Sequence, residues 1–139
     1  MKTQLYQQNP SLKKDYTKAL QYYKNIVESD GGSIVIGPNY RLGVMYYHGL
    51  GVDENKEMAF IYFSRESLGA ASLSKKTHVL NSYFTSLVNF NLATMMYNGI
   101  GTEQDYEMAY KYFRRSANWY KGSFLDHRFM PAIYYIGKM

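Results

Sequence analysis

The sequence predicts an all-α fold built from antiparallel helix pairs, and three observations support this prediction. The stretch YRLGVMYYHGLGVDENKEMAFIYF at 40–63 returns fifty residues later as FNLATMMYNGIGTEQDYEMAYKYF at 90–113. Apolar residues in each copy recur at spacings of three and four, which places them on one face of a helix. A Gly-x-Gly pair divides each copy into two such stretches, so each copy is expected to contain two helices joined by a short turn.

The first helix of the pair is expected to begin near Pro38 and to end at Gly49. Leu42, Met45 and Tyr46 have the i, i+3, i+4 spacing of one helix face. Proline suits the first turn of a helix because the N–H that it lacks would have no partner there. Glycine suits the end because it adopts the left-handed conformation without a side-chain clash.

The Gly-x-Gly pair itself is interpreted as the hinge between the paired helices. A dinucleotide-binding loop would follow a strand and would carry a third glycine three residues after the second. Glu54 occupies that position, and a helical pattern precedes Gly49. The pair recurs as Gly99 and Gly101 in the same context. A structural role in a repeated unit therefore fits better than ligand binding.

The second helix is expected to follow Asn55 in one copy and Asp105 in the other. Both side chains can accept hydrogen bonds from the free N–H groups at a helix start. Ala59, Tyr62 and Phe63 then form an apolar face at helical spacing. A small residue such as Ala59 lets paired helices approach closely, and the aromatic rings fill the space between layers.

Two shorter matches extend the pattern over a chain of 139 residues, which has room for one domain. DYTKALQYYK at 15–24 resembles DYEMAYKYFR at 105–114, and YYIGKM at 134–139 overlays YRLGVM at 40–45. The expected single domain at 1–139 comprises the second helix of a partial repeat at 15–29, a repeat at 38–68, an insertion at 69–87, a repeat at 86–118 and the start of a further repeat at 131–139. The insertion is long enough for an additional short helix around 76–87.

The two full copies resemble Sel-1-like repeats, which are relatives of the tetratricopeptide repeats. The resemblance includes the Leu-Gly-x-Met-Tyr helix, the Gly-x-Gly turn, the acidic cap and the paired aromatic residues of 40–63 and 90–113. It implies a right-handed α-solenoid of about three repeats with incomplete ends, whose concave surface or edges bind other proteins. It also implies an adaptor or an assembly scaffold and not an enzyme.

Composition narrows the remaining classes of function. The chain has no cysteine, so a thiolate zinc site and a cysteine nucleophile are excluded. The formal charge of +5 is compatible with acidic partners. No apolar run long enough to span a membrane occurs, and the opening MKTQLYQQNPSLKKD lacks the apolar run of a secretory signal. An intracellular location is expected, with the cytoplasm and the mitochondrion both open.

The chemical groups of the sequence predict no catalytic, cofactor or metal site. His48, His78 and His127 are too scattered for a local metal motif. Asp126 precedes His127, but adjacent helix residues point in different directions. DGGSIVIG at 30–37 lacks the lysine of a phosphate-binding loop. Nucleic-acid binding stays a less favoured alternative, based on abundant tyrosine and the basic pairs Lys13–Lys14, Lys75–Lys76 and Arg114–Arg115.

Two regions are expected to bind a protein partner. An apolar helix face near the end of the sequence would lack a partner within the repeat and would mark an interaction site; its residues are Ala132, Tyr135, Ile136 and Met139. The insertion contributes Lys75, Lys76, Tyr83 and Phe84, because insertions that break a repeat period often serve binding. The expected function is a small structural or assembly subunit of a larger intracellular complex, with the mitochondrion as one candidate compartment. The alternative is a free-standing adaptor that recruits separate partners.

Overall fold

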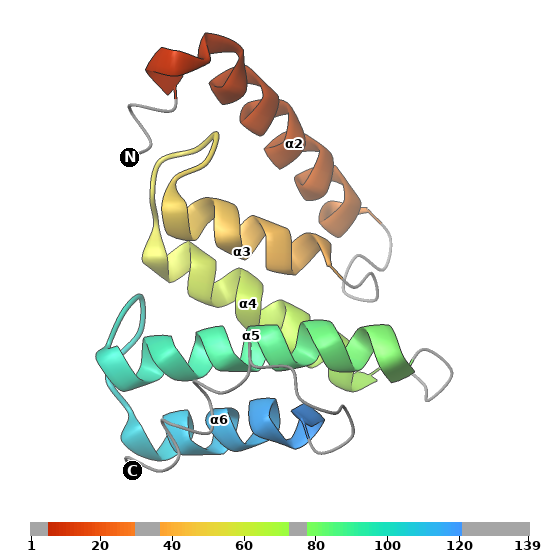
Figure 1. Ribbon diagram of the computed structural model, residues 1–139, viewed down its shortest axis with the longest axis vertical. Helices are drawn as coiled ribbons and strands as arrows, with labels where there is room; N and C mark the ends of the chain where they lie inside the picture. Colours follow the sequence, from red (N-terminus) through yellow and green to blue (C-terminus); the bar gives the residue numbers. More distant parts are fainter. Residues whose placement is uncertain (1–5, 30–36, 73–77, 121–139) are drawn as a thin grey trace.

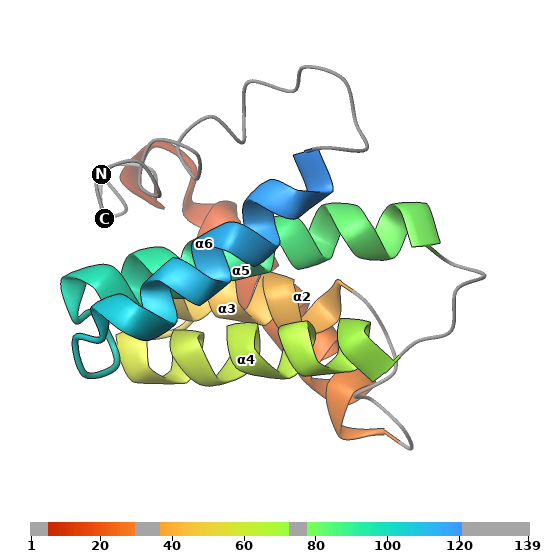
Figure 2. The same ribbon diagram turned by 90° about the horizontal axis from the view of Figure 1, so that it is seen from below.

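The computed structural model describes residues 6–29, 37–72 and 78–120, and the regular structure within these ranges is helical. The long helices are α2 (Pro10–Glu28), α3 (Pro38–His48), α4 (Lys56–Ser72), α5 (His78–Asn98) and α6 (Tyr106–Tyr120). Each packs on the next helix in the sequence, and consecutive helices run in opposite directions (Figure 1). Figure 2 shows the same stack end-on, with α6 in front. The predicted all-α solenoid of antiparallel helix pairs is confirmed.

Helix α3 begins and ends as its sequence predicts. Pro38 stands at its first position, and Gly49 follows its last residue with φ of 67° in the left-handed region. The N–H groups of Gly49 and Leu50 both donate to the carbonyl oxygen of Met45. The last carbonyl groups of the helix are thereby satisfied while the chain turns away.

Helices α4 and α6 both begin with the predicted side-chain caps. The Asn55 Oδ1 atom accepts a hydrogen bond of 3.0 Å from the N–H of Met58. The Asp105 Oδ1 atom accepts an equivalent bond of 3.0 Å from the N–H of Met108. Each cap satisfies an N–H group that the helix itself leaves without a partner.

The predicted apolar faces form the core of the stack. Ala59 and Ala109 are fully buried, which allows α3 to approach α4 and α5 to approach α6 closely. The core includes Leu20 of α2, Leu42, Met45, Tyr46, Tyr62 and Phe63 of the first full pair, and Val88, Leu92, Ala93, Met95, Met96 and Phe113 of the second.

Two boundaries differ from expectation. Helix α2 begins at Pro10 and not at 15, because Pro10 fits the first turn and the repeat comparison starts only where the copies become similar. The expected additional helix around 76–87 is wrong as a separate element. Residues 69–72 extend α4, and 78–87 form the first half of a continuous α5. The sequence from 78 to 98 contains neither glycine nor proline, so nothing interrupts that helix.

The second glycine of each Gly-x-Gly turn lies against the backbone of the preceding helix pair. A Cβ atom on Gly51 would lie 2.5 Å from the carbonyl carbon of Tyr16 in α2. A Cβ atom on Gly101 would overlap the carbonyl oxygen of Lys56 in α4. Tyr16 and Lys56 are equivalent positions, because Ala19 and Ala59 align at the same offset. The turn therefore joins successive repeats as well as the two helices of one repeat.

Candidate functional site

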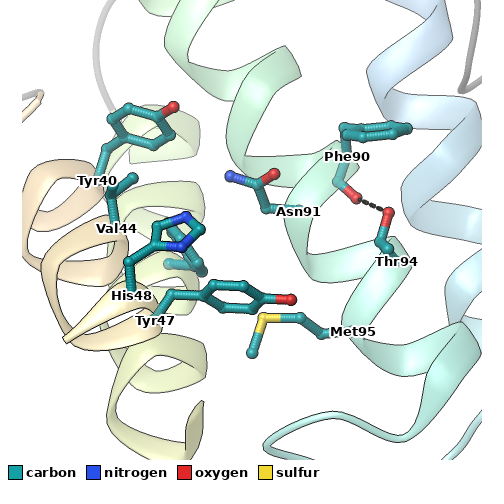
Figure 3. Close-up of a pocket in the computed structure, with 9 residues that line it drawn as sticks. Tyr40, Val44, Tyr47, His48, Phe90, Asn91, Thr94 and Met95 are labelled. Carbon is teal, nitrogen blue, oxygen red and sulfur yellow. Dashed lines mark hydrogen bonds between the residues drawn. The ribbon is translucent and has the colours of Figure 1, made fainter. Parts of the chain in front are cut away.

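A groove opens between the first helices of the two full repeats, α3 and α5. Its volume is about 280 Å³, and Figure 3 shows side chains from both helices facing it. We call it the α3–α5 groove; it is lined by Tyr40, Val44, Tyr47, His48, Phe63, Phe90, Asn91, Thr94 and Met95. Apolar and aromatic walls with a few polar groups are typical of a binding site.

A second groove of about 340 Å³ lies on the other side of α3, against α2. We call it the α2–α3 groove; it is lined by Tyr16, Ala19, Tyr23, Tyr40, Arg41, Val44, Met45 and Leu50. Tyr40 and Val44 line both grooves. These two side chains form the ridge between neighbouring grooves, so one extended ligand could occupy both.

The two grooves are equivalent sites in successive repeats. Tyr23 of α2 corresponds to Phe63 of α4 by the alignment of Ala19 with Ala59. The α3 residues of the α2–α3 groove correspond to α5 residues of the α3–α5 groove at an offset of 50: Tyr40 to Phe90, Arg41 to Asn91, Val44 to Thr94 and Met45 to Met95. Successive repeats therefore have grooves at equivalent positions. The side chains at some of these equivalent positions differ in polarity.

Local contacts fix two walls of the α3–α5 groove. The Lys56 Nζ atom lies 3.5 Å from the centroid of the Tyr47 ring and donates a hydrogen bond of 2.8 Å to the Tyr47 carbonyl oxygen. Tyr47 extends from α3 toward α5 in Figure 3. On α5 the Thr94 Oγ1 atom donates a hydrogen bond of 2.9 Å to the Phe90 carbonyl oxygen (Figure 3).

A buried carboxyl group holds the start of α3, where Tyr40 stands. Glu66 of α4 is only 2% exposed and accepts a hydrogen bond from the N–H of Gly37. Burial raises the pKa of the Glu66 carboxyl, and bonds from the backbone N–H groups of Gly37 and Tyr40 oppose that rise. The side chain replaces the cap that Gly37 does not supply.

A polar contact joins α4 to α5 but has no equivalent between α2 and α3. The Ser67 Oγ atom donates a hydrogen bond of 3.0 Å to Oδ1 of the buried Asn89. Asn39 is the equivalent of Asn89, and Val27 is the equivalent of Ser67. Among the described residues, the Asn39 Oδ1 atom is buried and accepts no hydrogen bond. Val27, which has no hydroxyl group, explains that missing bond.

The residues that the sequence analysis assigned to partner binding are largely outside the described ranges. Lys75, Lys76, Ala132, Tyr135, Ile136 and Met139 lie outside them, and Tyr83 and Phe84 belong to α5 without a described side chain. The groove residues Tyr40, Arg41, Val44 and Asn91 were not predicted. A usable signal was present, because they stand between core positions of the first helix and recur at one offset.

Two other kinds of site find no support in the part of the chain that the structure describes. Over 6–29, 37–72 and 78–120, no cluster of three or more histidine or acidic side chains could hold a metal ion. None of the helices in these ranges combines the length and apolar character needed to cross a membrane.

Comparison with known proteins agrees with the repeat pattern. The Sel1 repeat family model matches residues 4–26, 39–65 and 86–118, which together make up more than half of the chain. The crystal structure of a Sel1 repeat protein from Oxalobacter formigenes is similar at 20% sequence identity, with a TM-score of 0.32. That similarity covers 91% of this chain and 58% of the other, so this chain spans less than two thirds of that protein. No curated protein matches the chain.

Proposed function

The chain belongs to the Sel1 repeat family, and we propose that it is a protein-interaction module that binds a partner segment along the α2–α3 and α3–α5 grooves. Sel1 repeats are protein–protein interaction modules. The observation that carries the proposal is the pair of equivalent grooves that meet at Tyr40 and Val44. Their walls suit an extended peptide, because aromatic rings supply contact area at little cost in side-chain entropy.

Two finer roles are compatible with this binding mode. The first is a small structural or assembly subunit that holds its partner permanently within a larger complex. The second is an adaptor that binds and releases separate partners. Native mass spectrometry over a dilution series distinguishes them, because a subunit keeps a fixed ratio to its partner and an adaptor dissociates.

Nucleic-acid binding is a weaker candidate because the two basic pairs within the described ranges lie far apart in the stack. Lys13 and Lys14 are in α2, whereas Arg114 and Arg115 are in α6, at the other end of the stack (Figure 1). The guanidinium groups of α6 also lie over their own tyrosine rings, 5.8 Å from Tyr110 and 4.7 Å from Tyr112. A nucleic-acid groove would need a continuous basic track.

The test fills the grooves without changing the charge. Val44 and Thr94 are equivalent, half-buried positions, and glutamine at both would replace apolar groove surface with larger polar side chains. We expect the Val44→Gln/Thr94→Gln variant to remain folded by circular dichroism and to lose the peptides that the wild type selects from a random library. Leu68→Gln is the control, since Leu68 is 72% exposed and lines neither groove. Equal peptide selection by all three proteins would refute the proposal.

A further inference from the structure

We propose that one face of α2 binds an amphipathic helix of a partner protein, in the way that α4 packs on α3 and α6 packs on α5. We call it the α2 face; its residues are Ala19, Tyr22, Tyr23 and Ile26. This inference goes beyond the proposed function, because it concerns a helix on α2 and not the segment that lies along the grooves.

The α2 face is more exposed than the equivalent faces of α4 and α6. Its residues align with those of the other two helices as follows: Ala19 with Ala59 and Ala109, Tyr22 with Tyr62 and Tyr112, Tyr23 with Phe63 and Phe113, and Ile26 with Glu66 and Ser116. Tyr22 is 64% exposed, whereas Tyr62 is 5% exposed and Tyr112 is half-buried. The other three residues of the α2 face are half-buried, and all of their equivalents are buried. The face that α3 covers on α4 is therefore left partly open on α2.

The α2–α3 groove includes part of this open face. Helix α4 contributes Phe63 to the α3–α5 groove, whereas α2 contributes Tyr16, Ala19 and Tyr23 to the α2–α3 groove. Ala59, the equivalent of Ala19, does not line the α3–α5 groove, because it is fully buried where α3 packs on α4. A helix on the α2 face would cover Ala19 and leave Tyr23 in the groove wall. Helix and groove ligand can therefore be bound together.

The described residues that precede α2 do not cover the α2 face. Tyr6 aligns with Tyr46 at an offset of 40, and the Tyr46 ring stacks on Tyr62 with centroids 5.5 Å apart. The Tyr6 hydroxyl oxygen instead accepts a hydrogen bond of 3.1 Å from the N–H of Gly51. Within the described ranges, no ring from another helix stacks on Tyr22, the equivalent of Tyr62. This position is therefore open to an aromatic ring of the partner.

The helices that cover the equivalent faces define the chemistry of the partner. Both carry a small residue at the contact, Gly43 in α3 and Ala93 in α5. A Cβ atom on Gly43 would lie 2.5 Å from the Phe63 ring, so a large side chain there would separate the two helices. Leucine precedes the small residue and methionine follows it two positions later; these buried residues are Leu42, Met45, Leu92 and Met95. We expect the same spacing in a partner helix that runs antiparallel to α2.

Ile26 distinguishes the α2 face from its two equivalents. Glu66 accepts a hydrogen bond from the backbone at the start of α3, and the Ser116 Oγ atom donates one of 2.9 Å to the Ser86 carbonyl oxygen. The Ile26 side chain can form no hydrogen bond, and burying a polar group against it would cost free energy. The partner should therefore be apolar at the position of Ser86, six residues before that of Leu92.

A helical peptide with the sequence of residues 36–48 is a suitable probe. It has Ile36 at the position equivalent to Ser86, followed by the leucine, glycine and methionine of α3. A short peptide is only marginally helical in water, so a cross-link joins positions 41 and 48, which are exposed in α3. Fluorescence anisotropy measures the binding of the labelled probe to the full chain.

Two substitutions in α2 form a matched pair. Ala19→Met places a larger side chain where the two helices must approach. Gln21→Met introduces the same residue at an exposed position of α2 outside the α2 face. Methionine is a good helix former, so both variants should remain folded, which circular dichroism checks.

We expect the wild type and Gln21→Met to bind the probe with similar affinity. Ala19→Met should bind it about tenfold more weakly or worse, because overpacking at a helix contact is destabilising. A probe with Gly43→Leu should lose a similar factor on the wild type. That result does not depend on the folding of any protein variant.

Three results would overturn the inference. Equal affinity of the probe for the wild type and Ala19→Met would exclude the α2 face as its binding site. Absence of binding at concentrations up to about 1 mM would refute helix binding on α2. Self-association of the wild type in analytical ultracentrifugation, lost in Ala19→Met, would show that a second copy and not a separate partner covers the face. The groove proposal is tested separately, by peptide selection on Val44→Gln/Thr94→Gln.

Discussion

Replacing Gly101 with alanine tests whether a backbone contact at the Gly-x-Gly turn joins successive repeats. Gly101 has φ of 70°, and its missing side chain leaves room for the carbonyl group of Lys56 in α4. Gly99 is in the same turn with φ of 67°, but a Cβ atom there would come closest to the Cβ atom of Gln104, at 3.3 Å. A contact of that length is relieved by a shift of a few tenths of an ångström, and the backbone atoms of Gln104 lie at ordinary contact distances of 3.5 and 3.7 Å. Gly99→Ala is therefore a control with the same conformational strain and no backbone overlap.

The expected losses of stability differ because only one substitution has a steric term. A non-glycine residue in the left-handed region costs about 1–2 kcal/mol, which the reduced entropy of the unfolded chain offsets by about 0.4–1 kcal/mol. Gly99→Ala should therefore lower the free energy of unfolding by about 1 kcal/mol. Gly101→Ala adds an overlap between Cβ and a backbone carbonyl, and relieving such crowding costs about 1–3 kcal/mol more.

Urea unfolding followed by circular dichroism measures both effects. Stability in a repeat protein includes the interfaces between neighbours, so separation of the α5–α6 turn from α4 should also reduce cooperativity. We expect Gly101→Ala to lower the midpoint more than Gly99→Ala and to decrease the slope of the transition. Equal losses in the two variants, with unchanged slopes, would show that the contact with Lys56 does not hold the repeats together.

Two further substitutions test the polar groups at the repeat junctions. Val27→Thr should raise the free energy of unfolding, measured in urea, by about 1 kcal/mol. The new hydroxyl group can donate a hydrogen bond to Asn39, as Ser67 does to Asn89. Val27→Ala is the control, and a loss of stability in Val27→Thr as large as that in Val27→Ala would contradict the prediction. Glu66→Gln should flatten the pH dependence of stability, which urea unfolding between about pH 4 and pH 7 can measure. Since burial raises the folded-state pKa of Glu66 above 4.5, its contribution is present below pH 4.5 and is lost as the pH rises through the raised pKa. Parallel pH profiles for wild type and variant would refute the assignment.

Sequence alone was sufficient for the helix pairs because their signals are local. Pro38, Gly49, Asn55 and Asp105 mark helix ends by chemistry that acts within one turn. The continuity of α5 was not predicted because the comparison of copies stops where their similarity stops. A helix continues for as long as no residue breaks it, whether or not its sequence repeats.

The grooves could not be predicted from the same signals. Tyr40 and Val44 line two grooves because α2 and α5 lie on either side of α3, which is a property of the stack and not of one helix. The role of Glu66 was also missed, because it reaches the N–H of Gly37 from a position 29 residues away in the sequence. A contact between side chains of two different helices can be identified only when the relative positions of the two helices are known.

The contacts of Gly51 and Gly101 allow the helices to pack in the order in which they are synthesised. Each glycine packs against a residue that precedes it in the chain, Tyr16 in one case and Lys56 in the other. A ribosome releases the chain from its N-terminus, so each supporting helix emerges before the turn that rests on it. Units can therefore dock in the order of their synthesis, without waiting for residues still to be translated.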